Sequence, residues 1–219
     1  MTELEEKFAR GLAAIDVEVT AEDVARLAAY FAELLKWRAK INLVARNTPV
    51  DELLENHFLD SLTLLPELAE ESCHLLDIGT GGGFPGLVCK AARPGLRLTL
   101  VEPRQKRVSF LRHIARTLGL NDTVIHDCRI EDEARIKTAG GYTHITCRAV
   151  TEIGPFLKMV ERFSVIRPRL LLMKGPKWQE EMAAAEAVLA TSAFRLSAVR
   201  EFVLPYSKAK RALLLFNVQ

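Results

Sequence analysis

A glycine-rich turn directly after a short apolar run is the first place in this sequence where residue types and spacing indicate chemistry. Residues 75–86 read LLDIGTGGGFPG, with an acid at Asp77 and glycines at Gly79, Gly81 and Gly83. Glycine has no Cβ, so the backbone can turn sharply and pass close to a ligand. A strand that ends in such a turn and continues into a helix predicts the nucleotide-binding corner of a doubly wound α/β sheet.

A second acid indicates which cofactor this corner binds. Residues 96–101 alternate as a strand does, and Glu102 follows directly. A carboxylate there can accept hydrogen bonds from both ribose hydroxyls of NAD or of S-adenosylmethionine (SAM). Asp77 would repel a pyrophosphate but complement the sulfonium and ammonium charges of SAM, and the turn has no Lys or Arg to neutralise phosphate. We therefore expect SAM, with Asp77 facing its positive charge; the missing GK[ST] excludes a P-loop.

A third strand end predicts where the adenine ring lies. Thr123–His126 is strand-like, and the loop after it contains Ile130 and Glu131. Ile130 can pack on the ring face, and Glu131 or the local backbone can meet the exocyclic amine. The same stretch also fits the polar start of a helix, and the sequence leaves both interpretations open.

The order of the remaining elements predicts the fold. A helical pattern over 152–162 lies between strand-like runs at 142–147 and 169–174, and the chain finishes with two more strand-like runs at 195–204 and 212–218. We expect an α/β, Rossmann-like class I SAM-dependent methyltransferase domain over 71–219: a mostly parallel seven-stranded sheet with a C-terminal antiparallel hairpin. An N-terminal helical extension over 1–70 packs on this core. In it, Thr20–Asp23 resembles a capping box and Asp51–Leu65 predicts a helix ended by Pro66.

Several motifs in order resemble one family. They are Trp37, Asn42-Leu43, His57-Phe-Leu-Asp60-Ser61, the glycine turn with Phe84-Pro85-Gly86, Lys106-Arg107, Phe110-Leu111, Arg148-Ala-Val150 and Lys174-Gly175. With them the chain is similar to the bacterial 16S rRNA guanine-N7 methyltransferases (RsmG, formerly glucose-inhibited division protein B). Cys147 stands where that family is expected to have Ser, a minor departure.

The resemblance implies a substrate and a set of cofactor contacts. The substrate is a guanine in the decoding region of 16S rRNA, and the implied SAM contacts are Gly79, Phe84, Ile130, Glu131 and Arg148. Together with the residues argued above, the predicted cofactor-binding set is Asp77, Gly79, Thr80, Gly81, Gly83, Phe84, Glu102, Ile130, Glu131 and Arg148.

The chemistry at guanine N7 needs few protein groups. N7 has a lone pair and no proton to lose, so in-line attack on the sulfonium methyl requires positioning and no general base. The chain has no [ND]-P-P-[YF] motif of amino-group methyltransferases and no Pro-Cys nucleophile, because Thr146 precedes Cys147. Arg148 is the predicted catalytic residue; it orients the methionine carboxylate or hydrogen-bonds guanine O6.

The charges are unevenly distributed. Residues 1–70 carry 7 Lys/Arg and 14 Asp/Glu, whereas residues 71–219 carry 23 and 14. A basic catalytic part favours a phosphate-bearing partner, here 16S rRNA or the small ribosomal subunit. The RNA-binding candidates are Asn42, Arg46, Lys106, Arg107, Lys174 and Lys177. Trp178 either stacks on a base or anchors a helix, and His57 and Asp60 either pair with each other or lean over the active-site mouth.

Composition limits the setting. No apolar run reaches the roughly 18 residues of a membrane span, and the acidic N-terminus does not fit a signal peptide. The four cysteines have no metal-binding spacing and fit free thiols in a reducing cytosol. We expect a cytoplasmic protein with no membrane or metal partner, for which a monomer suffices.

Three other functions use some of the same features. A NAD-dependent oxidoreductase shares the glycine turn, but Asp77 and the lack of a Tyr-x-x-x-Lys motif or second substrate domain count against it. A non-catalytic RNA-binding or assembly factor would not need Asp77, the glycines and Glu102 together. A small-molecule methyltransferase fits the fold, but the basic asymmetry argues against it.

Overall fold

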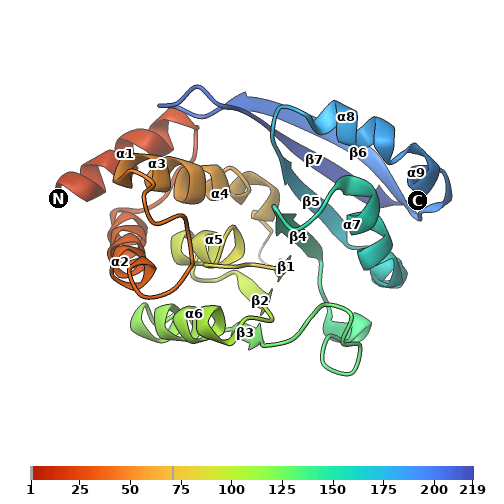
Figure 1. The fold of residues 1–219 in the computed structure, drawn as a ribbon, viewed down its shortest axis with the longest axis horizontal. Coiled ribbons are helices and arrows are strands. Elements are labelled where there is room, and N and C mark those ends of the chain that lie inside the picture. Colours follow the sequence, from red (N-terminus) through yellow and green to blue (C-terminus); the bar gives the residue numbers. More distant parts are fainter. Residues whose placement is uncertain (1, 71) are drawn as a thin grey trace.

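A seven-stranded sheet forms the centre of the computed structural model, which describes residues 2–70 and 72–219 (Figure 1). Its strand order is β3-β2-β1-β4-β5-β7-β6. The strands are β1 (His74–Ile78), β2 (Arg97–Val101), β3 (Thr123–His126), β4 (His144–Arg148), β5 (Arg169–Lys174), β6 (Phe194–Val203) and β7 (Lys210–Val218). β1 to β5 pair in parallel, and β7 runs antiparallel to both β5 and β6. The predicted class I architecture with its terminal hairpin is confirmed.

Helices cover both faces of the sheet. On one face α2 (Ala21–Arg38) packs on α5 (Gly86–Ala92) and α6 (Gln105–Thr117); on the other α7 (Ile153–Val160) packs on α8 (Trp178–Ala184) and α9 (Glu186–Thr191) (Figure 1). Three short 3-10 helices of the described residues lie between the longer elements: η2 (Leu65–Leu68), η3 (Thr138–Gly140) and η4 (Glu161–Ile166). Because strand side chains alternate between faces, Leu75 joins one hydrophobic cluster and Leu76 the other.

The N-terminal helices share a hydrophobic core with the sheet. α1 (Glu3–Ala14) and α2 contribute Phe8 and Phe31 to the same cluster as Leu98 of β2 and Leu213 of β7. Thr20 and Asp23 form the predicted capping box, with each side chain bonded to the other residue's backbone N–H. The predicted boundary at residues 70/71 falls on residue 71, which lies outside the described residues.

One continuous helical segment contains a π-helical stretch. It comprises α3 (Val50–Leu53), the π-helix η1 (Leu54–Leu59) and α4 (Asp60–Leu62). The predicted helix over Asp51–Leu65 is therefore wrong at its end, because the helix stops at Leu62 and Pro66 lies within the 3-10 turn η2. π-helical turns inside α-helices are frequently found at functional sites.

The four cysteines, Cys73, Cys89, Cys128 and Cys147, are buried free thiols. Across residues 2–70 and 72–219, no helix is both long and apolar enough to cross a membrane.

Candidate active site

The glycine turn lies between β1 and α5 at the carboxyl edge of the sheet. The Gly79 N–H donates to the Val101 carbonyl at the end of β2 (2.8 Å). Gly79 has a φ of +69°, and a Cβ there would lie 2.6 Å from Cγ2 of Val150. Only glycine therefore lets the turn pass this close to the loop that follows β4.

Asp77 lies beneath the turn. Its side chain has no exposed surface, and its Oδ2 accepts hydrogen bonds from the Thr80 hydroxyl (2.6 Å) and the Gly86 N–H (2.8 Å). Burial raises the pKa of the Asp77 carboxyl to about 6. The expectation that Asp77 faces the cofactor is corrected: the carboxylate holds the turn together and can act on a bound cation only through its charge. Thr80, which is 2% exposed, has the same supporting role.

Glu102 joins β2 to the turn. One carboxylate oxygen accepts the Gly81 N–H (3.0 Å) and the other the Arg104 N–H (2.9 Å), while an Arg107 nitrogen lies 3.6 Å away. A carboxylate oxygen can accept more than one hydrogen bond. Glu102 therefore fixes the turn and is buried, with 2% of its surface exposed; its contact with ribose hydroxyls stays a prediction.

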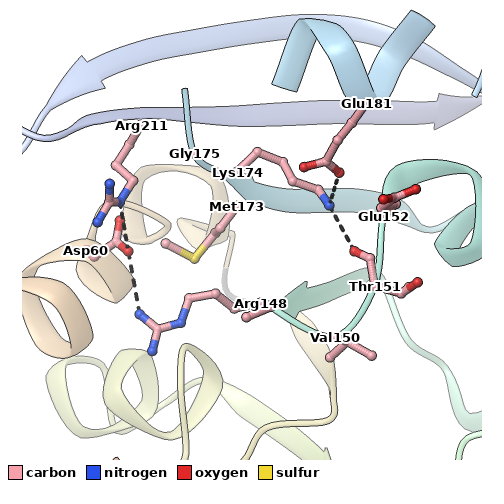
Figure 2. A pocket seen from close by; sticks show the side chains of 11 residues that line it. Asp60, Arg148, Val150, Thr151, Glu152, Met173, Lys174, Gly175, Glu181 and Arg211 are labelled. Carbon is pink, nitrogen blue, oxygen red and sulfur yellow. Dashed lines mark hydrogen bonds and ion pairs between the residues drawn. The ribbon is translucent and has the colours of Figure 1, made fainter. Parts of the chain in front are cut away.

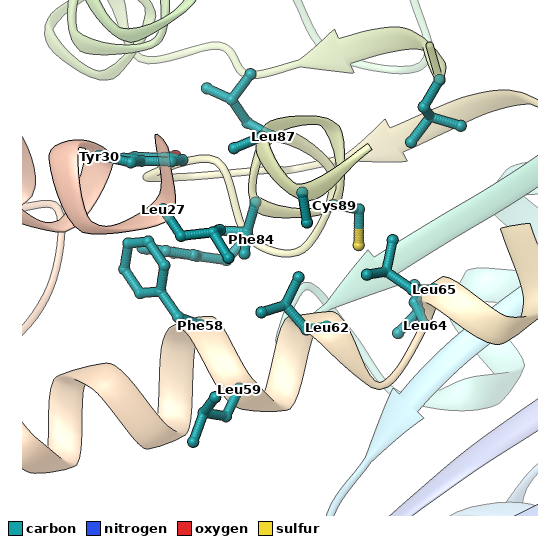
Figure 3. Packing of buried hydrophobic residues seen from close by; sticks show 14 of the residues in the cluster. Leu27, Tyr30, Phe58, Leu59, Leu62, Leu64, Leu65, Phe84, Leu87 and Cys89 are labelled. Carbon is teal, nitrogen blue, oxygen red and sulfur yellow. The ribbon is translucent and has the colours of Figure 1, made fainter. Parts of the chain in front are cut away.

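Phe84 points its ring into the core rather than outward. The ring is stacked with the rings of Tyr30 (6.5 Å between centroids) and His57 (4.8 Å). It also makes an edge contact with the ring of Phe58 (5.7 Å); Figure 3 shows Phe84 with Tyr30 and Phe58. Phe84 is 5% exposed. The ring of Phe84 is therefore occupied by core contacts, and the implied contact of Phe84 with SAM stays a prediction. Tyr30 also donates a hydrogen bond from its hydroxyl to the Gly82 carbonyl (2.6 Å), so α2 supports the turn directly.

An apolar cavity of about 170 Å³ opens at the ends of β1, β2 and β3. Ile130 is buried in its wall, and Glu131 lines it while remaining exposed to solvent. Residues 131–135 form turns rather than a helix, so the alternative helix start is excluded. The remaining lining includes Gly79 and Val150. A flat apolar ring fits between these side chains, and the charge of Asp77 lies beneath the neighbouring turn. The residues present thus fit the adenosine and the cationic part of SAM.

A second, more polar cavity of about 450 Å³ adjoins the first at Val150. We call it the target cavity. Figure 2 shows its lining: Asp60, Arg148, Val150, Thr151, Glu152, Met173, Lys174, Gly175, Glu181 and Arg211. Its walls come from the ends of β4 and β5, the start of β7 and the helix after η1. The mixture of three cations with three carboxylates suits a ligand that both donates and accepts hydrogen bonds, such as a nucleobase.

The π-helical segment holds Arg148 in place. The guanidinium donates to the Asn56 carbonyl (2.6 Å) and to Nδ1 of His57 (2.6 Å), and it lies 3.5 Å from Oδ2 of Asp60. Burial and the charge of Arg148 lower the pKa of His57 to about 3, so His57 is neutral at pH 7 and its Nδ1 accepts the hydrogen bond. His57 and Asp60 thus both contact Arg148, but only Asp60 lines the target cavity.

Asp60 connects two arginines. Its Oδ2 lies 3.4 Å from Nε of Arg211, and Arg211 also donates to the Asn56 side chain (3.1 Å). Burial raises the pKa of Asp60, whereas Arg148 and Arg211 lower it in part. Sequence reasoning missed Asn56, Arg211 and Val150 as site residues. The basic run Lys208–Arg211 was a signal for Arg211, but its partner in the η1 segment lies about 150 positions earlier.

The RNA-binding candidates separate into two groups. Asn42, Arg46, Lys106 and Arg107 line one cleft, although Asn42 and Arg46 lie in the loop after α2 and not in the helix. Lys174, by contrast, donates to the Thr151 carbonyl (3.0 Å) and to Glu181 (2.7 Å), so it braces the loop after β4.

The two residues at the start of α8 have different surroundings. Lys177 is exposed. Trp178 is half-buried, packs on the core and donates to Glu201 (2.9 Å). This favours the interpretation of Trp178 as a helix anchor.

Comparison with known proteins agrees with this geometry. The family model described as rRNA small subunit methyltransferase G matches residues 23–212. The chain is 52% identical over 211 residues to "Ribosomal RNA small subunit methyltransferase G" of Desulfotalea psychrophila, covering 96% of this chain and 97% of that protein. It is 43% identical over 188 residues to the protein of the same name from Sorangium cellulosum, covering 84% and 77%.

Among solved structures, the fold resembles M. jannaschii TYW2 in complex with AdoMet. The TM-score is 0.53 at 11% identity, over 72% of this chain and 74% of that one.

Proposed function

We propose the function of this chain from one premise: it belongs to the rRNA small subunit methyltransferase G family and is a methyltransferase. The proposed reaction moves a methyl group from SAM to N7 of a guanine in the decoding region of 16S rRNA. The substrate is the rRNA or the small ribosomal subunit. Because ribosomes lie in the cytoplasm, the enzyme would work there.

The observation that carries the proposal is the pair of cavities that meet at Val150. The apolar cavity suits an adenine ring against Ile130, and we assign the ribose hydroxyls to Glu102, which follows Val101 of the cavity wall in the chain. The target cavity lies on the other side of Val150 and is large enough for a base. A ligand in each cavity would therefore meet at the loop after β4, which is the arrangement that group transfer requires.

The chemistry asks the protein mainly to position its substrates. SAM, when bound, supplies an activated methyl group on a sulfonium. The guanine N7 attacks with its lone pair and releases no proton, so no residue of the target cavity has to act as a base. As N7 reacts, positive charge develops on the guanine. Asp60 and Glu181 of the cavity are already paired with cations, which leaves Glu152 as the carboxylate that can stabilise this charge.

Arg148 has the central positioning role in this proposal. It lies at the end of β4, lines the target cavity and is held by Asn56 and His57. Its place next to Val150 suits an interaction with guanine O6, which leaves N7 free to react. An interaction with the methionine carboxylate uses the same position. A NAD-dependent activity shares the glycine turn and Glu102, and no further observation favours it.

Radiolabelled SAM tests the proposal directly. Small subunits from cells lacking this gene are incubated with the protein and labelled SAM, with subunits from wild-type cells as the control. Label is expected in 16S rRNA of the first sample only. If calorimetry shows SAM binding but no methyl group is transferred, the assignment of the cofactor stands and the assignment of the substrate is contradicted. NADH binding in place of SAM would contradict the cofactor.

A further inference from the structure

A basic cleft lies apart from both cavities described above. Its volume is about 620 Å³, and it forms between the loop after α2 and the start of α6. We call it the basic cleft. It is lined by Lys40, Ile41, Asn42, Arg46, Arg104, Gln105, Lys106 and Arg107. Five of these eight residues are cations and none is an acid.

Four of the cations have no acidic partner. Lys40, Arg46, Arg104 and Lys106 are exposed, and no carboxylate of the described residues lies within ion-pair distance of them. Among the described residues, some exposed cations elsewhere, such as Arg135, are paired with acids and others, such as Lys137, are not; the cleft differs because four such cations line one concave site. The loop after α2 is also basic within an acidic part of the chain, because no Asp or Glu occurs between Glu33 and Asp51. Unpaired cations gathered in a concave site create a strong positive potential.

Arg107 has a different task in the same cleft. Its Nε donates to the Asn42 carbonyl (3.2 Å), and its Nη1 lies 3.6 Å from Glu102. It therefore ties the loop to α6 and to the glycine turn, and it fixes the spacing of the cleft walls. The amino-terminal end of α6, which opens into the cleft, adds the partial positive charge of unpaired backbone N–H groups.

The position of the cleft relates it to the reaction. The glycine turn approaches the cleft at Gly81, where an added Cβ would lie 3.6 Å from Nη1 of Arg107, and it approaches the target cavity at Gly79 through Val150. Arg107 of the cleft and Val150 of the target cavity thus each lie close to one glycine of the same turn. An RNA strand that places one base in the target cavity can continue over the turn and bring its backbone to the cleft.

We propose that the basic cleft binds backbone phosphates of the RNA substrate next to the target nucleotide. This rests on the proposed rRNA substrate. Lys40, Arg46, Arg104 and Lys106 contact the phosphates and determine the register of the strand, while the target cavity selects the base. The cleft takes no part in the binding of SAM.

A matched pair of variants tests this assignment. The cleft variant is Lys40→Ala/Arg46→Ala/Lys106→Ala, and the control is Arg116→Ala/Lys137→Ala/Lys158→Ala. The control removes the same charge at exposed residues outside the cleft. For both, the KM for unmethylated small subunits, kcat, the SAM dissociation constant and the salt dependence of subunit binding are measured.

The cleft variant is expected to raise KM at least about fivefold at 0.15 M KCl with SAM affinity unchanged. Its log–log salt slope is expected to fall by about 2, because each phosphate contact contributes ~0.7 on a single strand. A KM and slope equal to those of the control would overturn the proposal.

Two further results separate this proposal from other possibilities. If the wild-type protein transfers no methyl group to small subunits, the proposed function fails, whereas the salt slope of subunit binding still tests the cleft. Calorimetry with ATP distinguishes the source of the phosphate. If the wild-type protein binds ATP as tightly as it binds subunits, and the cleft variant does not bind ATP, the cleft is a site for a free nucleotide. That result would overturn its assignment to RNA.

Discussion

Replacing Asp77 by Asn should raise the free energy of unfolding and weaken the binding of SAM. The carboxyl is fully buried, and burial raises its pKa from 3.8 to about 6. Near pH 4 the carboxyl is neutral in the folded protein, and its burial costs little. As the pH rises through 6 the folded protein must bury a negative charge, so stability is lost. A pKa difference of about 2 corresponds to about 3 kcal/mol.

Asn imitates the protonated carboxyl. Its carbonyl can accept the hydrogen bonds from Gly86 and Thr80 that Oδ2 of Asp77 accepts now. Its amide takes the place of Oδ1, which has no hydrogen-bond partner among the described residues, and this costs about 1 kcal/mol. The variant is therefore expected to be more stable by about 2 kcal/mol at pH 7.5. The loss of the buried charge beneath the turn should weaken SAM binding at least about tenfold.

Urea unfolding without cofactor, from pH 4.5 to 7.5, measures the stability difference, and calorimetry measures the affinity. The difference between Asp77→Asn and the wild type should shrink as the pH falls toward 4. A variant that is less stable than the wild type at pH 7.5, with a difference independent of pH, would refute the reasoning about Asp77.

Three other substitutions test the supports of the site. Tyr30→Phe removes the buried hydroxyl that donates to the Gly82 carbonyl and should lower the free energy of unfolding by about 1–2 kcal/mol in urea; an unchanged value would contradict that role. Arg148→Lys keeps the charge but loses the fork to His57, so kcat should fall at least about tenfold, and a wild-type kcat would argue against positioning by this contact. Ile130→Asp places a charge in the apolar cavity and should raise the SAM dissociation constant at least about tenfold with an unchanged circular dichroism spectrum; wild-type affinity would remove Ile130 from the cofactor site.

The sheet and the glycine turn could be predicted because their signals are local. Each strand is a short apolar run with a polar or glycine-containing segment after it, and the chain order of these runs matches the parallel strands and the final hairpin. The helix that carries His57 was harder to predict from the sequence. Its π-helical turn has i→i+5 bonds that the residue types do not indicate, and Pro66 is tolerated in the 3-10 turn beyond its true end.

The orientation of side chains at the turn could not be predicted. Residue types place Asp77 and Phe84 in the motif. Whether each side chain points into the core or toward a ligand depends on partners far away in sequence. Phe84 turns inward because Tyr30 of α2 and Phe58 of η1 offer it an aromatic pocket (Figure 3). Asp77 turns inward because Gly86 presents an N–H at the start of α5.

The hydrogen-bond network around Arg148 could not be predicted for the same reason. Asn56 and Asp60 lie about 90 positions before Arg148, and Arg211 lies about 60 positions after it. The sequence indicated a possible pair of His57 and Asp60 and, separately, Arg148, and the packing of the η1 segment against β4 and β7 brings all three together. Figure 2 shows Asp60 between Arg148 and Arg211.

The most direct test of the account is the identity of the methylated nucleoside. 16S rRNA labelled by this protein from radioactive SAM, in small subunits from cells lacking the gene, is digested to nucleosides and separated. All of the label is expected to migrate as 7-methylguanosine. Label in a nucleoside methylated on an exocyclic amine, on the ribose or on a carbon would contradict a target cavity that works by positioning without a base.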